Sequence, residues 1–426
     1  MKIAESRLLL VLPIVPWPIR RNGISLRFGP IIDYLSRRYE LDLLVLAERP
    51  EPGEREGPLQ RCRAVTIIPV PVVALAPLVR RLKVAWSGLV PWGLPLGSTR
   101  NIARRELERK VAQFLERERY STVIWGAGHL DTACRLRRQH PQVRFVSDVV
   151  DSPALASGRA RSIRADLRFL SRYTAWKWRR LERRVEAVFD AVIYISEVDA
   201  RAARSRHTPR VHVVPNGLTY ADAPLRLRRE PPTNRIIGFL GDMSYSPNVS
   251  AVLRLARQIF PRVVDAIGDA RLLIIGRNPV PEIRSLQSAA ITVTGTVDDI
   301  WPYVSQANVF VFPMIEGAGL QNKILEVMYA EVPVVTTWMA AAGVGAVDAG
   351  QLLVGDTDDD IAKKTVRLLC DRAYAGQLAE RARQFVMREF DWKTILPRYE
   401  AIVAVPARGD HTDTLSSRSS SAERSG

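Results

Sequence analysis

NVFVFPMIEGAGLQNKILEVMYAEVPVVTT, residues 308–337, is the stretch of the sequence that indicates how the chain folds. Residues 308–312 are apolar and rich in strand-forming side chains, and a proline ends the run. A loop with two glycines follows, residues 320–330 then carry apolar side chains at helical spacing, and residues 332–336 form a second apolar run. Strand, glycine loop, helix and strand predict a βαβ unit, which binds ligands where the first strand ends and the helix begins.

The loop and the first helical turn of this unit have the features of an anion site. Gly319 lets the backbone approach a ligand closely, and the free N–H groups at the helix start near Leu320 would face an anion. Lys323 lies in the first turn, where the helix dipole disfavours a cation unless an anion such as a diphosphate binds beside it. Glu326 lies one turn further on, on the same helix face as Lys323 and Asn322. The alternative is a surface ion pair between Lys323 and Glu326 beside an ordinary glycine loop.

Charge and composition restrict the class of protein. The 426 residues include 62 Lys and Arg against 45 Asp and Glu, and the net charge of +17 suits a polyanion such as nucleic acid, anionic lipid or a nucleotide-linked substrate. Three scattered cysteines are too few for a disulfide framework or a zinc site, which favours a reducing, cytoplasmic setting. The apolar run at residues 7–15 is interpreted as a buried strand, because no small-residue cleavage site follows it. No run reaches the roughly 18 apolar residues that span a bilayer.

Strand and helix patterns alternate in two successive arrays of similar size. Two such arrays predict an α/β protein with two doubly wound, Rossmann-like domains facing each other across a cleft. The predicted parts are an N-terminal domain over 1–218, a linker over 219–234, a C-terminal domain over 235–389, a helical segment over 390–406 that packs back on the N-terminal domain, and a disordered tail over 407–426.

Two basic, tryptophan-bearing stretches interrupt the first array, at residues 77–96 and 159–184. In the second stretch, arginines at helical spacing fall on one face and apolar residues are available for another. Basic amphipathic helices with tryptophan at the boundary bind anionic membrane surfaces, and we expect peripheral membrane contact here. The alternative is a long helix packed in the domain with a solvated arginine face.

The strands of the second array end in glycine or polar residues that a parallel sheet would place along one rim. Gly241 follows one strand, Gly276 and Arg277 follow another, and Glu316 lies in the loop of the central unit. Arginine forks suit phosphate oxygens, so this rim predicts a diphosphate site. No GxGxxG opens either array, no GxxxxGK[ST] is present and no HExxH occurs, which argues against a dinucleotide oxidoreductase, a P-loop NTPase and a zinc hydrolase.

This succession of motifs resembles the nucleotide-sugar half of family 4 glycosyltransferases, and within that family it is most similar to bacterial exopolysaccharide sugar transferases. The matching segments are GFLG at 238–241, LIIGR at 273–277, GTVDD at 295–299, NKILEVM at 322–328 and VPVV at 332–335. The resemblance covers residues 234–388 specifically and the first half only by pattern. It implies a GT-B fold, a nucleoside-diphosphate sugar donor, no cofactor or obligatory metal, and transfer with retention of anomeric configuration.

The resemblance also implies roles for residues of the second half. Glu326 would hold the ribose of the donor. The diphosphate and the nucleoside would be contacted by Gly241, Arg277, Gly319, Leu320, Asn322 and Lys323. The family's first carboxylate falls at Ala318. Either the loop bulges to deliver the nearest acid, Glu316, for the catalytic role, or backbone amides hold the donor sugar instead. The family's basic pair after the first strand is also missing, with Asp242 and Asn248 near those positions.

In the first half, Gly23 and Arg27 match places where the family's N-terminal domain approaches the donor phosphates. Asp148 and Asp151 follow a strand that faces the cleft, and two nearby carboxylates could orient an acceptor hydroxyl or stabilise an oxocarbenium-like centre. They could equally belong to a helix cap, because Asp-Ser-Pro at 151–153 is a good helix-start sequence.

The function predicted from the sequence is a retaining glycosyltransferase that transfers a sugar from a nucleoside-diphosphate donor to a glycan or lipid-linked acceptor, in exopolysaccharide or cell-surface glycan synthesis. We expect it on the inner face of the cytoplasmic membrane, with no nucleic-acid partner. Two alternatives remain: a nucleotide-sugar epimerase of the same fold, and a basic, non-catalytic nucleic-acid-binding protein. The second lacks a recognisable recognition module.

Overall fold

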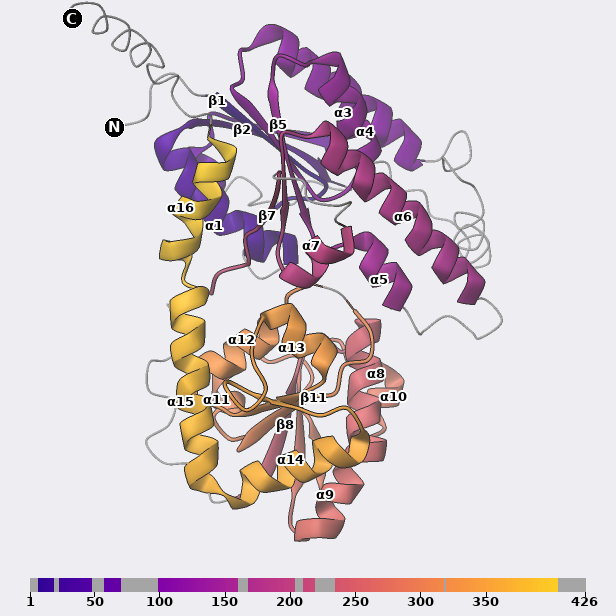
Figure 1. Cartoon of the computed structure of the whole chain (residues 1–426), viewed down its shortest axis with the longest axis vertical. Coiled ribbons are helices and arrows are strands. Elements are labelled where there is room, and N and C mark those ends of the chain that lie inside the picture. Colours follow the sequence, from indigo (N-terminus) through magenta and orange to yellow (C-terminus); the bar gives the residue numbers. More distant parts are fainter. Residues whose placement is uncertain are drawn as a thin grey trace, which may run out of the picture.

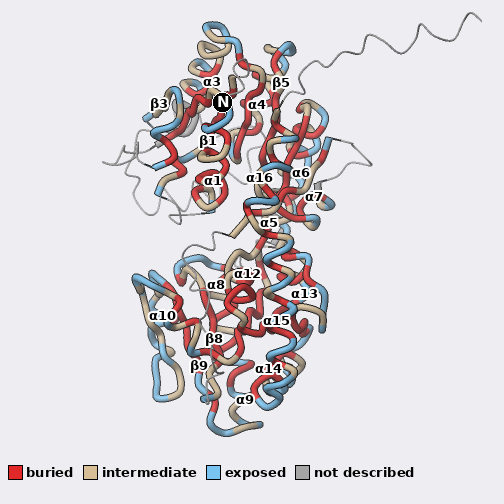
Figure 2. The backbone as a smooth tube through the Cα atoms, turned by 90° about the vertical axis from the view of Figure 1, so that its left-hand side faces the viewer, coloured by how far each residue is buried: buried red, intermediate tan, exposed pale blue. Residues whose placement is uncertain are grey.

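Two α/β domains make up the chain, one above the other in the computed structural model of Figure 1. The structure describes residues 7–18, 23–47, 57–69, 99–159, 168–203, 210–218, 234–317 and 319–404. In Figure 2 the buried residues concentrate along the strands inside each domain, and the exposed residues cover the outer helices and loops. Each domain therefore has its own core, as two doubly wound units require.

The N-terminal domain is built on a seven-stranded parallel sheet. Its strands in spatial order are β3 (Ala64–Pro69), β2 (Glu40–Ala47), β1 (Arg7–Leu12), β4 (Thr122–Gly126), β5 (Arg144–Val150), β6 (Ala191–Tyr194) and β7 (Val211–Val213). Its helices are α1 (Gly23–Arg38), the short 3₁₀ helix η1 (Gly57–Arg61), α3 (Thr99–Arg117), α4 (Leu130–Gln139), α5 (Pro153–Arg159), α6 (Arg168–Val188) and α7 (Glu197–Ala203). Leu8 and Leu10 of β1 pack with α1, whereas Leu9 and Val11 pack on the other face with α3 and α4. The unbroken apolar run of β1 is thus that of a strand buried on both faces.

The C-terminal domain is built on a six-stranded parallel sheet. Its strands in spatial order are β10 (Ile291–Val293), β9 (Arg271–Ile275), β8 (Ile236–Leu240), β11 (Val309–Phe312), β12 (Val334–Thr336) and β13 (Leu353–Val354). Its helical segments are α8 (Ser246–Arg254), the π-helical turn η4 (Leu255–Ile259), α9 (Phe260–Ile267), α10 (Pro281–Arg284), α11 (Trp301–Val304), α12 (Asn322–Tyr329), α13 (Trp338–Val344), α14 (Asp358–Cys370) and α15 (Arg372–Glu389).

Strand order reverses once in each sheet. In the N-terminal sheet the reversal lies between β1 and β4, and in the C-terminal sheet it lies between β8 and β11. Open parallel sheets bind ligands beyond the carboxyl ends of their strands at such a switch point. The loop after β5 contacts the loop after β11, so the two carboxyl edges face each other across the junction of the domains.

The last helix, α16 (Trp392–Val403), crosses from the C-terminal domain to the N-terminal domain, as the yellow ribbon of Figure 1 shows. Its apolar residues join the core beneath α1. The hydroxyl groups of Tyr34 and Tyr39 both donate to the Glu400 carboxylate, at 2.6 and 2.9 Å. Since α15 packs on α12 and α16 packs on α1, the end of the chain ties the two domains together.

The predicted strands over 308–312 and 332–336 lie within two residues of β11 and β12, and the predicted α/β class with two Rossmann-like domains is confirmed. The predicted helix over 320–330 is α12, which begins two residues later. Helix α3 was not predicted, because its sequence is mainly polar and few of its residues enter the core. The basic stretch 77–96, the predicted disordered tail and all but the last residue of the predicted linker over 219–234 lie outside the described residues.

A buried ion pair holds the N-terminal domain together near the cleft. The Arg27 guanidinium donates through Nε to both Asp148 oxygens, at 2.8 and 3.0 Å, and both side chains have 0% exposure. Its Nη1 donates to the Val214 carbonyl and to Asn216 Oδ1, each at 3.0 Å. Four hydrogen bonds from one guanidinium join α1, β5 and the segment after β7, and the Tyr399 ring of α16 lies 5.8 Å away.

This ion pair corrects two predictions made from the sequence. Arg27 was predicted to approach the donor phosphates and Asp148 to act in catalysis, but each is enclosed by protein and neutralised by the other. Each charge of a buried ion pair needs its oppositely charged partner and additional hydrogen bonds to offset the loss of water. The two side chains therefore serve the fold and do not line the cleft.

Replacing either partner of this pair is expected to be costly. Arg27→Ala leaves the Asp148 carboxylate buried without its cation, and we expect the free energy of unfolding to fall by about 3–5 kcal/mol in urea denaturation. The double variant Arg27→Met/Asp148→Leu should lose clearly less free energy of unfolding than the sum of the losses of the single variants Arg27→Met and Asp148→Leu. Arg37→Ala, which breaks an exposed pair with Asp33 on the same helix, is the control and should cost about 0.5 kcal/mol or less. Equal losses for Arg27→Ala and Arg37→Ala would refute this role.

Candidate functional site

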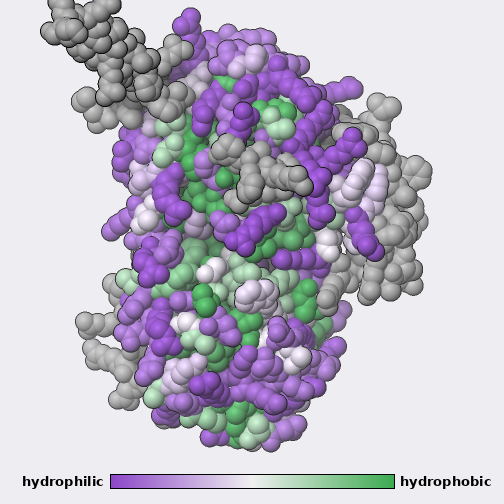
Figure 3. All heavy atoms as spheres, viewed as in Figure 1, coloured by the Kyte–Doolittle hydropathy of each residue, from purple (hydrophilic) through white to green (hydrophobic). Residues whose placement is uncertain are grey.

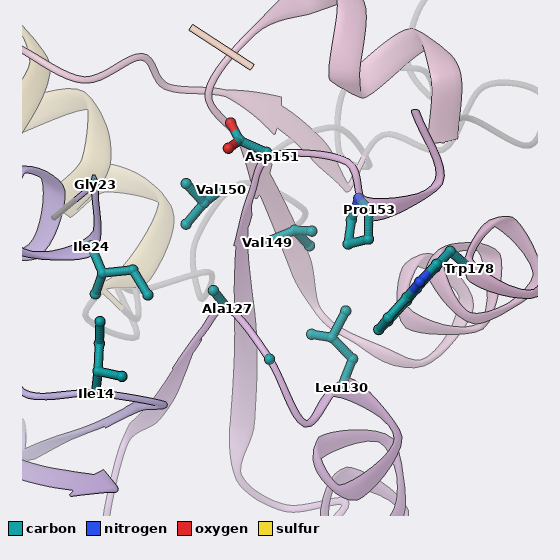
Figure 4. A pocket seen from close by; sticks show the side chains of 11 residues that line it. Ile14, Gly23, Ile24, Ala127, Leu130, Val149, Val150, Asp151, Pro153 and Trp178 are labelled. Atoms are coloured by element: carbon teal, nitrogen blue, oxygen red, sulfur yellow. The ribbon is translucent and has the colours of Figure 1, made fainter. Parts of the chain in front are cut away.

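A pocket of about 400 Å³ opens at the carboxyl ends of β1, β4 and β5 in the N-terminal domain (Figure 4). Its lining consists of Ile14, Gly23, Ile24, Ala127, Gly128, Leu130, Val149, Val150, Asp151, Pro153 and Trp178. Figure 4 shows Ile14 and Ile24 on one side, Leu130 and Trp178 on the other, and Asp151 at the rim. An apolar cavity with a single carboxylate is suited to an organic ligand with one polar group at its mouth. This cavity is called the N-terminal pocket below.

A backbone turn after β5 directs Asp151 to the rim. The register of β5 shifts between Asp148 and Val150, and Val150 has a φ of 69°, a left-handed conformation that a β-branched residue rarely adopts. The helix cap predicted from Asp-Ser-Pro is made by Ser152, whose Oγ accepts from the Leu155 N–H at 3.1 Å. Because Ser152 caps α5, the Asp151 carboxylate is left to face the pocket.

Asp151 is poised to exchange a proton near neutral pH. Its carboxylate lies at the pocket rim, between the N-terminal domain and Gly319 of the C-terminal domain. This burial, together with the negative charge of Asp199, raises the pKa of Asp151 to about 7. A carboxyl group with a pKa near the working pH is suited to general acid or base catalysis.

The loop between β11 and α12, residues 313–321, is called the glycine loop, and it meets Asp151 directly. Gly317 and Gly319 have φ values of 111° and 75°, which favour glycine. A Cβ added at Gly319 would lie 1.8 Å from Asp151 Oδ1. Only glycine lets the two domains approach this closely, so the site contains groups from both.

Glu316 of the glycine loop is buried and accepts a hydrogen bond from Ser250 Oγ of α8 at 3.2 Å. Tyr245, in the turn before α8, lies near this carboxylate and near Asp151: burial raises the pKa of its phenol, and the two negative charges raise it further. Two carboxylates and a phenol, from the loops after β5, β8 and β11, therefore gather at the cleft. Tyr245 was not predicted, because nothing in its sequence context distinguishes it from a surface tyrosine.

Lys323, in the first turn of α12, lies below the glycine loop with its ammonium group largely removed from water. Its Nζ donates to Asn248 Oδ1 and lies 3.6 Å from Met314 Sδ. The rings of Phe239 and Phe312 lie 5.2 and 5.7 Å from it. Burial lowers the pKa of Lys323 to about 7, and no carboxylate among the described residues offsets this effect.

Asn248 occupies the region where the resembling family has a basic residue. Its Nδ2 donates to the Asp242 carbonyl at 2.9 Å, which turns its oxygen toward Lys323. A Cβ at Gly241 would lie 2.7 Å from Asn248 Nδ2, so Gly241 makes room for this amide. Gly241 thus supports the site through Asn248.

The remaining predicted residues lie at different depths. Arg277 is exposed at the rim after β9 and pairs with Asp242 at 2.9 Å. Leu320 is buried, and Glu326 is partly exposed on α12. Asn322 accepts from Asn216 Nδ2 of the N-terminal domain at 3.4 Å. The structure therefore brings the predicted residues of the glycine loop and α12 together, places Arg277 at the edge and puts Gly23 in the lining of the N-terminal pocket.

Helix α6 carries part of the basic stretch predicted at 159–184. Trp178 faces the N-terminal pocket, whereas Trp176 is 53% exposed and stacks on Tyr173 with ring centroids 5.9 Å apart. The exposed residues at helical spacing on this helix are Arg172, Trp176, Arg179 and Arg183. Among the helices that the structure describes, none combines the length and the apolar character needed to cross a bilayer.

Hydrophilic residues cover most of both domains in Figure 3, and hydrophobic residues show in patches, several of them where the domains meet. Within the described ranges, His, Cys, Asp and Glu side chains do not gather in threes at any place suited to a metal ion.

Comparison with known sequences finds one family match, in the second half of the chain. Residues 234–371 match the family described as glycosyl transferases group 1. A Klebsiella pneumoniae protein described as "Uncharacterized 44.6 kDa protein in cps region" is 22% identical over 316 residues, which cover 71% of this chain and 76% of that protein.

Solved structures superpose on nearly the whole chain. Sucrose-phosphate synthase (tll1590) from Thermosynechococcus elongatus has a TM-score of 0.66 at 15% identity, covering 93% of this chain and 98% of that one. TarM of S. aureus has a TM-score of 0.67 at 10% identity, covering 95% and 99%. Anabaena Alr3699/HepE in complex with UDP-glucose has a TM-score of 0.60 at 13% identity, covering 92% and 98%.

These comparisons show the fold and support a class of protein. The fold is GT-B, with two parallel-sheet α/β domains. The match of residues 234–371 to the glycosyl transferases group 1 family, together with the fold, supports a glycosyltransferase.

Anion binding at Lys323 should depend on pH. Above pH 7, Lys323 is largely neutral while the site is empty. When a diphosphate binds, Lys323 takes up a proton and regains its charge. We therefore expect the affinity for the tightest-binding of UDP, GDP and ADP to fall several-fold between pH 7 and 8.5, with proton uptake detected by calorimetry in two buffers. Lys323→Met should weaken binding at pH 7 and remove the proton uptake. Binding without proton uptake in the unsubstituted chain would contradict this assignment.

Proposed function

We propose that the chain is a retaining, hexosyltransferase-type family 4 glycosyltransferase that transfers a sugar from a nucleoside-diphosphate donor to a glycan or lipid-linked acceptor. The observation that carries the proposal is Lys323, a desolvated ammonium group at the start of α12, directly below the glycine loop. The similar HepE structure holds UDP-glucose, and a donor of that class supplies the anion that Lys323 requires.

The donor would lie on the C-terminal domain. Its diphosphate would meet Lys323 and the backbone of the glycine loop, its ribose would reach Glu326, and Arg277 would lie at the outer edge of the nucleoside. Hydrogen-bond donors that are held in place around the developing negative charge lower the energy barrier for departure of the diphosphate. Since Lys323 is held by Asn248 and two rings before the donor arrives, little reorganisation is needed at that moment.

The acceptor would enter from the N-terminal pocket. Its hydroxyl would lie beside Asp151, which can hold or release a proton at neutral pH, while the apolar walls take a less polar part of the acceptor. During transfer the bond from the sugar's anomeric carbon to the diphosphate breaks, and a bond from that carbon to the acceptor oxygen forms. The acceptor proton passes to Asp151 or to the departing diphosphate. Retention of configuration follows from the family resemblance.

This pocket separates the proposal from its same-fold alternative. A nucleotide-sugar epimerase acts on the donor alone and does not require an apolar cavity opposite it, whereas a transferase requires a place for its acceptor. The Klebsiella relative is described as lying in a cps region, which supports a role in exopolysaccharide or cell-surface glycan synthesis.

A test of the proposal is transfer from a panel of nucleotide sugars, with hydrolysis and epimerisation followed in the same samples. We expect one nucleotide sugar to be consumed with formation of its nucleoside diphosphate, equally in the presence of EDTA. Glu326→Gln should raise the donor KM at least about tenfold, because a charge-assisted hydrogen bond to the ribose is lost.

The matched control is Glu380→Gln, which changes an exposed glutamate of α15 in the same domain and should leave the donor KM unchanged. An unchanged KM in Glu326→Gln would refute the ribose-holding role. Epimerised nucleotide sugar as the main product would favour the alternative enzyme.

We also propose a peripheral position on the cytoplasmic membrane face, with the exposed face of α6 on anionic lipid. Trp176 and the arginines around it form a basic, tryptophan-bearing surface that continues from the wall of the N-terminal pocket. We expect the chain to co-sediment with anionic vesicles. Substitution of Arg172, Arg179 and Arg183 by glutamine should remove their positive charge and abolish this co-sedimentation.

The control for this experiment is the same charge change on α15, at the exposed residues Arg372, Arg381 and Arg388. Equal release by both sets of substitutions would show that only net charge matters. Tight, salt-sensitive binding of duplex or single-stranded DNA in place of vesicles would favour the nucleic-acid-binding alternative.

A further inference from the structure

The turn between β5 and α5, residues 150–154, carries Asp151 to the rim of the N-terminal pocket and is called the Asp151 turn below. Two carboxylates inside the domain hold this turn, Glu182 of α6 and Asp199 of α7, and each residue has 0% exposure. Buried carboxylates are costly unless they accept hydrogen bonds, so the bonds that these two make show what they do in the fold.

Glu182 accepts two hydrogen bonds from the Asp151 turn at a single oxygen. The Ser152 hydroxyl donates to Glu182 Oε1 at 2.9 Å, and the Ala154 N–H donates to the same oxygen at 3.1 Å. Ser152 Oγ in turn accepts from the Leu155 N–H and caps α5. Glu182 therefore holds the turn and the start of α5 together.

The segment that begins α7 holds the turn on both sides of Asp151. The N–H group of Ile195 donates to the Val150 carbonyl at 3.0 Å, and the Ser152 N–H donates to Asp199 Oδ1 at 3.0 Å. The left-handed backbone at Val150 persists only where the surrounding structure fixes it. These two bonds lie at the residue before Asp151 and at the residue after it, so they fix the direction in which its side chain leaves the backbone.

Both carboxylates are anchored by their own helices. Ser196, the residue before α7, donates its hydroxyl to Asp199 Oδ2 and accepts from the Asp199 N–H at 3.2 Å. Glu182 lies one helical turn after Trp178, a wall residue of the N-terminal pocket, and Figure 4 shows Pro153 of the turn on the same side of the pocket as Trp178. One face of α6 thus forms the pocket wall and holds the turn.

The Asp199 carboxylate also acts on Asp151 through its charge. Burial is the main cause of the raised pKa of Asp151, and the negative charge of Asp199 raises this pKa further. The other described groups that interact electrostatically with this carboxyl group are Arg27 and Asp148 behind it and the Tyr245 phenol of the C-terminal domain.

We propose that Glu182 and Asp199 are positioning residues for glycosyl transfer: they fix the Asp151 turn from inside the N-terminal domain and so set where the Asp151 carboxyl group meets the acceptor. This inference rests on the proposed function, because it takes Asp151 as the group beside the acceptor hydroxyl. Glu182 acts through geometry alone, whereas Asp199 acts through geometry and charge. A reacting group that is misplaced by about 1 Å can lose about a hundredfold in rate, so such a hold matters for catalysis.

The first experiment tests the hold without any ligand, by hydrogen exchange at the Ser152 and Ala154 amides of the full chain. Glu182→Leu removes the accepting oxygen and should speed exchange at Ala154 at least about threefold. Glu182→Gln is the conservative variant: Oε2 makes no hydrogen bond within the described part of the chain, and glutamine keeps the accepting oxygen. Exchange in Glu182→Gln should therefore stay within about twofold of the unsubstituted protein.

The thermal unfolding midpoint of each variant reports whether the domain still folds. Where Glu182→Leu does not fold, Ser152→Ala takes its place, because it removes the hydroxyl that Glu182 holds and leaves both carboxylates in the domain. Ser152→Ala should also speed exchange at Ala154.

The second experiment measures transfer by the same proteins as a function of pH. Glu182→Leu, or Ser152→Ala in its place, should lower kcat at least about tenfold and leave the donor KM within about twofold, because the proposed donor site lies on the other domain. Glu182→Gln should keep most of kcat. This contrast separates a positioning role from a general loss of structure, which would affect donor binding as well.

Asp199→Asn tests the charge, since asparagine keeps an oxygen for the Ser152 N–H. If Asp151 takes the acceptor proton, kcat/KM for the acceptor rises with pH around the Asp151 pKa of about 7. Removing the neighbouring negative charge lowers that pKa, so the midpoint should move to lower pH by at least about 0.5 in Asp199→Asn. Glu197→Gln removes a negative charge from an exposed pair on the same helix and should change neither kcat nor the midpoint.

Each outcome decides one part of the proposal. Equal exchange at Ala154 in the unsubstituted protein and in the variant that removes the Glu182 contact would overturn the hold on the turn. Faster exchange with unchanged kcat would overturn the positioning role, and an unmoved midpoint in Asp199→Asn would overturn the part assigned to its charge. Faster exchange with no transfer from any nucleotide sugar by any of the proteins would overturn the proposed function and leave the hold on the turn in place.

Discussion

The ammonium group of Lys323 is the constraint on which the site depends. The fold removes it from water and gives it an amide oxygen, a thioether and two aromatic rings, but no carboxylate among the described residues. Such a cation is costly to keep charged in the empty chain and is stabilised by a bound anion. The strands that end at this point, the glycine loop and the first turn of α12 all serve to place it at the edge of the sheet.

The N-terminal domain has two acidic residues close together, Asp148 in β5 and Asp151 just after it. Asp148 is neutralised by Arg27 inside the domain, and its neighbour Asp151 is turned outward by the strained backbone at Val150. One carboxylate therefore supports the fold and the other is free to react. The left-handed Val150 costs on the order of 1–3 kcal/mol, which the surrounding packing must offset. This division gives the cleft one proton-exchanging acid opposite one desolvated cation.

The sequence was sufficient to predict the elements with local patterns. Unbroken apolar runs predicted the parallel strands, and the position of Lys323 in the first helical turn of α12 is confirmed, while its role in anion binding stays a prediction. Contacts between distant residues were not predictable: Arg27 and Asp148 are 121 positions apart, and each alone looked like a cleft residue. The direction of Glu316 toward Ser250 depends on how the glycine loop packs against α8.

The most direct test of the account is the structure of the full chain with its tightest-binding nucleoside diphosphate. We predict that a diphosphate oxygen lies within about 3 Å of Lys323 Nζ and of the Gly319 N–H, with the ribose on Glu326. A diphosphate bound elsewhere, with Lys323 still on Asn248, would contradict it.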